Sequence, residues 1–257
     1  MAFSPEYRAY PTQTGTNAAA IDAGLRAYMS RVYNWMASGL LLTGIVAYAV
    51  ANYPPLTGLF YHMVRVGPGH VVPSPTVLGY AAMFAPLAFV LAINFGINRM
   101  AASTVQALFW AFCAVMGASL ANIFMIYTGA SVARVFFVTA ATFAGTSLYG
   151  YTTKADLTKM GSFMMMGLFG LIIASLVNMF MQSSALQFAI SLIGVVVFVG
   201  LTAWDTQRIK GDYQQFAYAE GTDEAAKRGV MDALSLYLNF INLFTMLMQF
   251  MGVRNNN

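Results

Sequence analysis

Long apolar runs with few or no charged residues alternate along the chain with polar or charged connections. We predict helices over seven of these runs, at 32–52, 76–95, 103–127, 131–151, 161–181, 186–204 and 233–253. A run of about twenty residues, at ~1.5 Å per residue, crosses the ~30 Å hydrocarbon core of a bilayer. Strands of a membrane barrel would alternate over only about ten residues. The pattern therefore predicts an all-α integral membrane protein, a bundle of seven transmembrane helices.

Composition agrees with this pattern, because 59% of the 257 residues are hydrophobic and only 9% are charged. Soluble domains usually contain about 25% charged residues. We interpret residues 1–31 as a mobile polar tail, 32–253 as one transmembrane domain and 254–257 as a second polar tail. The proline-rich segment 53–75 is predicted as a loop, and the charged segment 205–232 as a hinge between the last two spans.

The distribution of lysine and arginine predicts which end of the bundle faces the cytoplasm. Ten basic residues fall on one side of the predicted spans (Arg8, Arg26, Arg31, Arg99, Lys154, Lys159, Arg208, Lys210, Lys227, Arg228) and three on the other (Arg65, Arg134, Arg254). Because the side rich in basic residues stays in the cytoplasm, we expect a cytoplasmic N-terminus and a C-terminus outside. The net charge of +4 comes from these span ends, so the expected partner is a lipid bilayer and not nucleic acid.

Polar side chains from three predicted helices meet at the cytoplasmic end. Asp205 follows the sixth span, Asn239 lies about two turns into the seventh, and Arg99 closes the second. An ionisable group inside a membrane bundle is by default a candidate functional site. We therefore predict a pH sensor or gate formed by Asp205, Asn239 and Arg99.

Other polar residues on the same helices have a simpler interpretation. Thr202 on the sixth span, and Ser235 and Asn242 on the seventh, share polar stripes with the candidate site. Such residues commonly form hydrogen bonds between helices, each worth ~0.6 kcal/mol. For Asp205 itself, the simpler alternative is an ion pair with Arg208, one turn further along the chain.

Nothing in the sequence indicates an enzyme. Neither histidine lies within a predicted span, so no base is evident for a nucleophile. The single cysteine has no second cysteine with which to form a metal motif. We therefore expect no catalytic residue and no bound cofactor.

Two segments of the chain resemble the Bax inhibitor-1 family, the transmembrane Bax-inhibitor-motif proteins. The string ALSLYLNFINLF at 233–244 is highly specific, and WDTQRIK at 204–210 follows an aromatic-Asp-x-x-x-Ile pattern of the family. The predicted spans and orientation are similar to those of the bacterial branch across residues 30–253. The resemblance implies a multi-pass protein of the cell inner membrane.

The resemblance also implies a function, a passive calcium leak that responds to pH. In such proteins, aspartates on the sixth and seventh helices sense protons and calcium, and an arginine at the end of the second helix pairs with them in some members. Asp205 matches the first aspartate and Arg99 matches the arginine, whereas Asn239 stands in place of the second aspartate. One carboxylate with one amide makes a weaker calcium site than two carboxylates, so Asp205 is expected to bind calcium weakly.

A second function is also compatible with the resemblance. Some bacterial relatives bind and modulate a membrane-anchored ATP-dependent protease. The protein would then be a non-conducting membrane regulator, and residues 1–31 would be the segment that contacts the protease.

Overall fold

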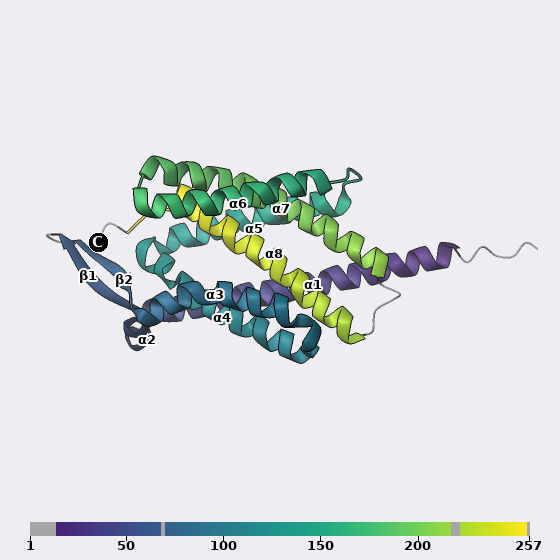
Figure 1. Ribbon diagram of the computed structural model, residues 1–257, viewed down its shortest axis with the longest axis horizontal. Coiled ribbons are helices and arrows are strands. Elements are labelled where there is room, and N and C mark those ends of the chain that lie inside the picture. The colour runs from purple at the N-terminus through teal and green to yellow at the C-terminus, as the bar shows by residue number, and fades with distance from the viewer. Residues whose placement is uncertain (1–13, 68–69, 217–221, 256–257) are drawn as a thin grey trace, which may run out of the picture.

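The computed structural model describes residues 14–67, 70–216 and 222–255, which form a bundle of long helices with a short hairpin at one end (Figure 1). The elements in chain order are α1 (Thr14–Asn52), α2 (Pro54–Phe60), β1 (Tyr61–Gly67), β2 (His70–Pro75), α3 (Val77–Gly96), η1 (Ile97–Arg99), α4 (Ala102–Ile126), α5 (Gly129–Thr152), α6 (Thr158–Met181), α7 (Ser184–Phe216) and α8 (Thr222–Met251). A helix occupies each predicted span, so the all-helical class is confirmed. Among the described residues, six helices (α1 and α4 to α8) are long and apolar enough to cross a membrane, whereas α3 contributes the shorter apolar helix Val77–Ile93.

The first helix, α1, begins at one end of the bundle, and the last helix, α8, ends at the opposite end. In Figure 1, α1 begins at the right, and α8 ends at the left beside the hairpin. At the left end, the N–H of Thr128 donates to the carbonyl of Val253 at 3.0 Å, and the N–H of Asn255 donates to the carbonyl of Ile126 at 2.8 Å. These bonds fasten the end of α8 to the connection between α4 and α5. Which end faces the cytoplasm stays a prediction from the basic residues.

The predicted tail 1–31 is helical from Thr14 onward, and residues 1–13 lie outside the described part of the chain. The physical reason is burial, because Leu25 and Tyr28 on this extension of α1 are almost fully covered by the bundle. A helix that buries apolar side chains gains stability that its sequence alone does not predict.

Two other segments predicted as irregular also contain regular structure. The predicted loop 53–75 forms α2 and an antiparallel hairpin, in which Tyr61 pairs with Pro75. A two-stranded hairpin tolerates proline because both of its strands are edges. The predicted hinge 205–232 is mostly helical, since α7 and α8 extend into it from both sides, and Ile209 within it is fully buried.

α8 lies at the centre of the bundle and α6 lies at its periphery. In its most apolar window, 67% of α8 is buried, compared with 11% of α6. Leu236, Tyr237 and Leu243 on α8 are fully buried, and the ring of Tyr237 packs edge-on against Phe112 of α4. α6 instead exposes large apolar side chains such as Phe169, as a helix facing lipid does. Asn239 on α8 is buried as well, inside the bundle.

Glycines bring α5 and α6 close to α7 directly before Asp205. A Cβ on Gly150 of α5 would overlap the carbonyl oxygen of Ala203, and one on Gly161 of α6 would overlap the ring of Trp204. Small residues permit this approach of helix backbones in membranes. The α7 backbone is thus held on two sides where Asp205 projects from it.

Candidate functional site

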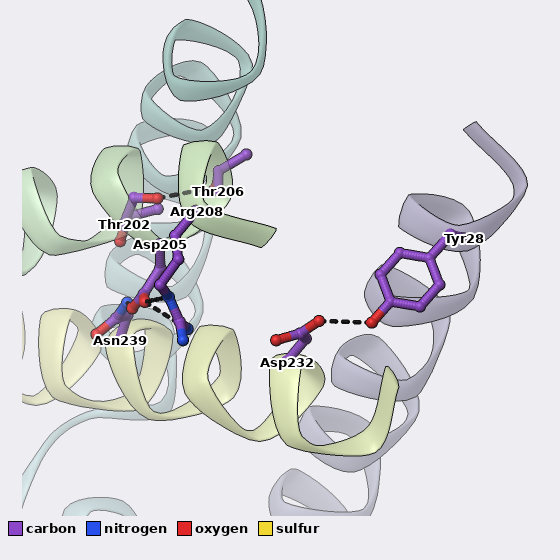
Figure 2. Close-up of polar contacts among 7 residues, drawn as sticks. All are labelled: Tyr28, Thr202, Asp205, Thr206, Arg208, Asp232 and Asn239. Carbon is purple, nitrogen blue, oxygen red and sulfur yellow. Dashed lines mark hydrogen bonds and ion pairs between the residues drawn. The ribbon is translucent and has the colours of Figure 1, made fainter. Parts of the chain in front are cut away.

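Asp205 lies within α7, which continues beyond it to Phe216 (Figure 2). The residue is buried, and its carboxylate Oδ1 lies 2.8 Å from Nη2 of Arg208 and accepts a hydrogen bond from Nε of Arg208 at 3.1 Å. The guanidinium also lies 5.5 Å from the ring centroid of Trp204. The ion pair predicted between Asp205 and Arg208, one turn further along the chain, is present.

Asn239 of α8 contacts the other oxygen of the same carboxylate. Its Nδ2 donates to Oδ2 of Asp205 at 2.7 Å, and both side chains are buried. Figure 2 shows Asn239 and Arg208 approaching Asp205 from different helices. The predicted meeting of Asp205 and Asn239 is confirmed, and the two interactions occupy both carboxylate oxygens. We call these three residues the Asp205 cluster.

Arg99 is not part of this cluster. It ends η1 with an exposed side chain, and it forms no ion pair with any residue in the described ranges. η1 follows α3, which packs mainly on α4 and not on α7. The structure therefore places Arg208, and not Arg99, at the Asp205 carboxylate.

The remaining predicted polar residues do not contact the carboxylate either. Thr202 is buried and donates to the carbonyl of Phe198 within its own helix at 2.7 Å. Ser235 and Asn242 are half-buried, and their side chains form no hydrogen bond with the described part of the chain. These residues lie near the cluster on the same helices without taking part in its contacts.

Sequence reasoning missed a second buried acid, Asp232 of α8. Its Oδ2 accepts a hydrogen bond from the hydroxyl of Tyr28 on α1 at 2.6 Å, and both residues are buried. Figure 2 shows Asp232 on the same helix as Asn239, nearer the start of α8, and Tyr28 on α1. A signal was present, because Asp232 is seven residues before Asn239 and so falls on the same helical face. The prediction began the last span at Ala233, and this boundary assigned Asp232 to the hinge.

A chain of hydroxyl groups fixes α7 beside the cluster. Ser147 of α5 shares hydrogen bonds with the hydroxyl of Tyr33 on α1 and, at 2.9 Å, with Thr206 on α7. Thr206 in turn donates to the carbonyl of Thr202 at 2.8 Å. Because Thr206 directly follows Asp205, α1 and α5 both influence the position of the helix that carries the carboxylate.

The donor set of the cluster is poor for a permanently bound metal. Calcium prefers six to eight oxygen ligands, whereas the Asp205 carboxylate already binds a guanidinium and an amide N–H. In the part of the chain that the structure describes, no group of three or more His, Cys, Asp or Glu residues could hold a metal ion. A cation at Asp205 would therefore compete with Arg208 for the carboxylate charge.

The fold and the site together define a multi-pass helical membrane protein with a buried, ion-paired carboxylate between two of its helices. Residues 25–256 match the family described as "Inhibitor of apoptosis-promoting Bax1". The chain belongs to this family, the Bax inhibitor-1 family, and the predicted resemblance is confirmed.

Bacterial relatives match over nearly their whole length. A protein of Rickettsia prowazekii is 48% identical over 253 residues, which cover 98% of this chain and 99% of the relative. A protein of Caulobacter vibrioides is 46% identical, with 91% of each chain covered. The inner membrane protein YbhL of Escherichia coli is 42% identical, covering 90% of this chain and 94% of YbhL. The inner-membrane location of YbhL and the six apolar helices of this chain agree with the predicted multi-pass inner-membrane protein.

Proposed function

We propose that this protein is a pH-sensitive cation leak with calcium as the transported ion, and that the Asp205 cluster is its gate. One observation carries the proposal. A carboxylate is buried between two helices that are able to span a membrane, and side chains from these helices occupy both of its oxygens. Packing alone does not require a charge at such a place, because apolar residues of similar volume are often equally stable there.

The contacts of Asp205 correspond to a closed gate. Arg208 neutralises the carboxylate from one side, and Asn239 donates to it from the other. The Arg208 side chain keeps 35% of its surface exposed, so it has a route toward solvent. Protonation of Asp205 removes the charge that holds Arg208, and an entering cation competes for the same charge. Acid and calcium thus act on one contact.

Asn239 supports a weak and transient interaction with the ion. An amide contributes an oxygen ligand without a negative charge, so an Asp–Asn pair attracts a divalent cation less strongly than two carboxylates do. Weak binding suits a leak, because an ion that conducts must also be able to leave. Asp205 is the one charged ligand that the cluster offers.

Other charged groups surround the site and have to be separated from it in any pH experiment. Arg208 also acts electrostatically on Asp232, together with Asp212 and Arg228. Asp232 is thus a second acid in the same field. A test of pH sensing therefore needs a variant of each buried acid.

Calcium entry into proteoliposomes that enclose a calcium indicator tests the proposal, with wild type, Asp205→Asn and Asp232→Asn compared across a pH series. We expect wild type to conduct with a clear pH dependence, and Asp205→Asn to lose that dependence. Asp232→Asn is the matched control, because it removes the same charge from the neighbouring acid. An Asp205→Asn protein that kept the wild-type pH midpoint would place the sensor elsewhere.

If folded wild-type protein conducts no calcium, the result would favour the alternative function, in which the protein is a non-conducting regulator of a membrane-anchored ATP-dependent protease. Co-purification of such a protease with the full chain, and its loss on removal of residues 1–13, would support that alternative. These residues lie outside the described part of the chain.

The proposed orientation has an independent test. A reporter fused after Asn257 is expected outside the cytoplasm, and a reporter fused after Lys210 is expected inside it. The reason is that ten of the thirteen basic residues fall on the side of the predicted spans that also holds the N-terminus and Lys210. A reporter found in the cytoplasm at the C-terminus would contradict the predicted seven transmembrane helices, because an odd number of helices places the two termini on opposite sides of the membrane.

A further inference from the structure

We propose that the α1–α5 cleft binds one glycerophospholipid with a net negative headgroup. This cleft has a volume of about 840 Å³ and lies between α1 and α5, with α7 at its mouth and α8 at its base. Its lining includes Arg26, Lys210, Ala140, Ser147 and Phe240. The proposal concerns a ligand outside the Asp205 cluster and does not depend on whether the protein conducts ions.

The mouth of the cleft carries the charge that a phosphate group requires. Arg26 is exposed and forms no ion pair with any described residue, although Asp22 lies one turn before it. Lys210 donates to the carbonyl of Tyr151 at 2.9 Å and lies 5.1 Å from the ring centroid of that residue. An ammonium has three N–H groups, so Lys210 can still bind an anion. Two cations and one acid leave the mouth net positive.

The interior of the cleft is apolar and continues beyond the mouth. Along α1, the lining runs from Arg26 to Met36, a distance of about 15 Å at ~1.5 Å per residue. A second hollow, of about 770 Å³, continues along α1 and shares Ala140 and Phe240 with the first. The second hollow has an almost wholly apolar lining, with residues such as Leu41 and Phe136. This length suits an acyl chain better than a compact soluble anion.

A bilayer supplies this combination of charge and apolar length at the right place. The cleft opens between helices that are able to cross a membrane, and its charged mouth lies where α1 begins and α7 ends. Basic residues near a membrane surface attract anionic lipids, at ~1 kcal/mol for each residue. The phosphate therefore lies at Arg26 and Lys210, and an acyl chain lies over Phe240.

Lipid binding to the purified full-length protein tests this site, measured by native mass spectrometry with phosphatidylglycerol and phosphatidylcholine of identical acyl chains. We expect wild type to retain phosphatidylglycerol preferentially, and Arg26→Gln/Lys210→Gln to lower this preference by about thirtyfold. Arg31→Gln is the matched control, since it removes an exposed charge from α1 that lies outside the cleft lining. Equal retention of both lipids by wild type would overturn the proposal. Retained preference in the double variant would also overturn it.

Two further measurements keep the test decisive. Arg26→Gln alone removes no hydrogen bond or ion pair with the described residues, so it carries the charge test if the double variant does not fold. Ala140→Trp fills the passage between the two hollows and should reduce retention of both lipids, whereas Ala141→Trp, one residue outside the lining, should not. Equal retention in these two variants would overturn the placement of the acyl chain. Glycerol phosphate carries the phosphate group without acyl chains. If it raised the thermal stability of the protein as much as phosphatidylglycerol does, the ligand would not be a lipid.

Discussion

The two buried acids in the described part of the chain, Asp205 and Asp232, are held in different ways. Asp205 has a guanidinium 2.8 Å away and an amide on its other oxygen, whereas Asp232 accepts a hydrogen bond from the neutral hydroxyl of Tyr28. The first acid joins α7 to α8, and the second joins the start of α8 to the extended start of α1. From this difference we expect a division of roles, in which the proposed gate at the Asp205 cluster responds to charge and the Asp232–Tyr28 pair fixes the first helix.

Loss of Arg208 is expected to have the largest effect, because it leaves the buried Asp205 charge without its counter-ion. Breaking a buried ion pair typically costs 3–5 kcal/mol. Since Arg208 is 35% exposed, we expect Arg208→Gln to lower the free energy of unfolding by about 2 kcal/mol. Equilibrium unfolding in detergent measures this change. Asp205→Asn/Arg208→Gln should recover most of the loss, and a double variant as unstable as Arg208→Gln alone would show that charge pairing is not the cause.

Asn239→Asp places a second carboxylate beside Asp205 and should have the next largest effect. The amide N–H that now lies 2.7 Å from Oδ2 would be replaced by an oxygen, and two like charges so close destabilise each other unless they share a proton or bind a cation. We expect a loss of about 1–2 kcal/mol at neutral pH without calcium.

The same variant should bind calcium more tightly than wild type does. The fully ionised pair needs a cation most, so stabilisation by calcium should grow as pH rises and fade as acid protonates the pair. Calcium titrations of thermal unfolding at several pH values compare the two proteins. Identical profiles would show that residue 239 does not affect the charge at Asp205.

The sequence predicted the Asp205–Asn239 contact but not which arginine completes it. Polar residues at helical spacing showed that Asp205 and Asn239 face the bundle interior, and the order of the spans placed them at one end. The choice between Arg99 and Arg208 depends on whether α3 packs against α7 or α4. Neither charge nor periodicity encodes that choice. The order of the spans and the resemblance both implied Arg99, whereas local spacing implied Arg208.

Helix ends were the other part of the fold that the sequence did not predict. Charged residues in α1 and α7 were interpreted as tail and hinge, although both segments are helical. Tertiary burial decides these cases, because Tyr28 and Ile209 lie between charged neighbours and still pack inside. Asp232 was missed for the same reason, since its span was assumed to begin after the last charge.

Tyr28→Phe tests the other acid and should have a smaller effect than either change at the Asp205 cluster. It removes the hydroxyl that donates to Asp232 at 2.6 Å and keeps the ring, which packs 4.9 Å from that of Tyr213. A hydrogen bond to a buried carboxylate in a membrane protein contributes about 1 kcal/mol. We expect a loss of that size in unfolding experiments, with calcium flux and its pH dependence unchanged. A shift in the pH midpoint of calcium flux in Tyr28→Phe would show that Asp205 and Asp232 act together as one sensor, and it would contradict the division of roles.

The smallest effect is expected from Ser235→Ala, a change on α8 between Asp232 and Asn239. Ser235 is half-buried, and its side chain forms no hydrogen bond with the described residues, so its loss should change the free energy of unfolding by less than about 0.5 kcal/mol. Ser147→Ala is the matched comparison, because its hydroxyl bonds both Tyr33 and Thr206. We expect about 1 kcal/mol there. If Ser235→Ala were the more damaging of the two, the polar face of α8 would act as a continuous unit, and the two acids could not be treated as separate sites.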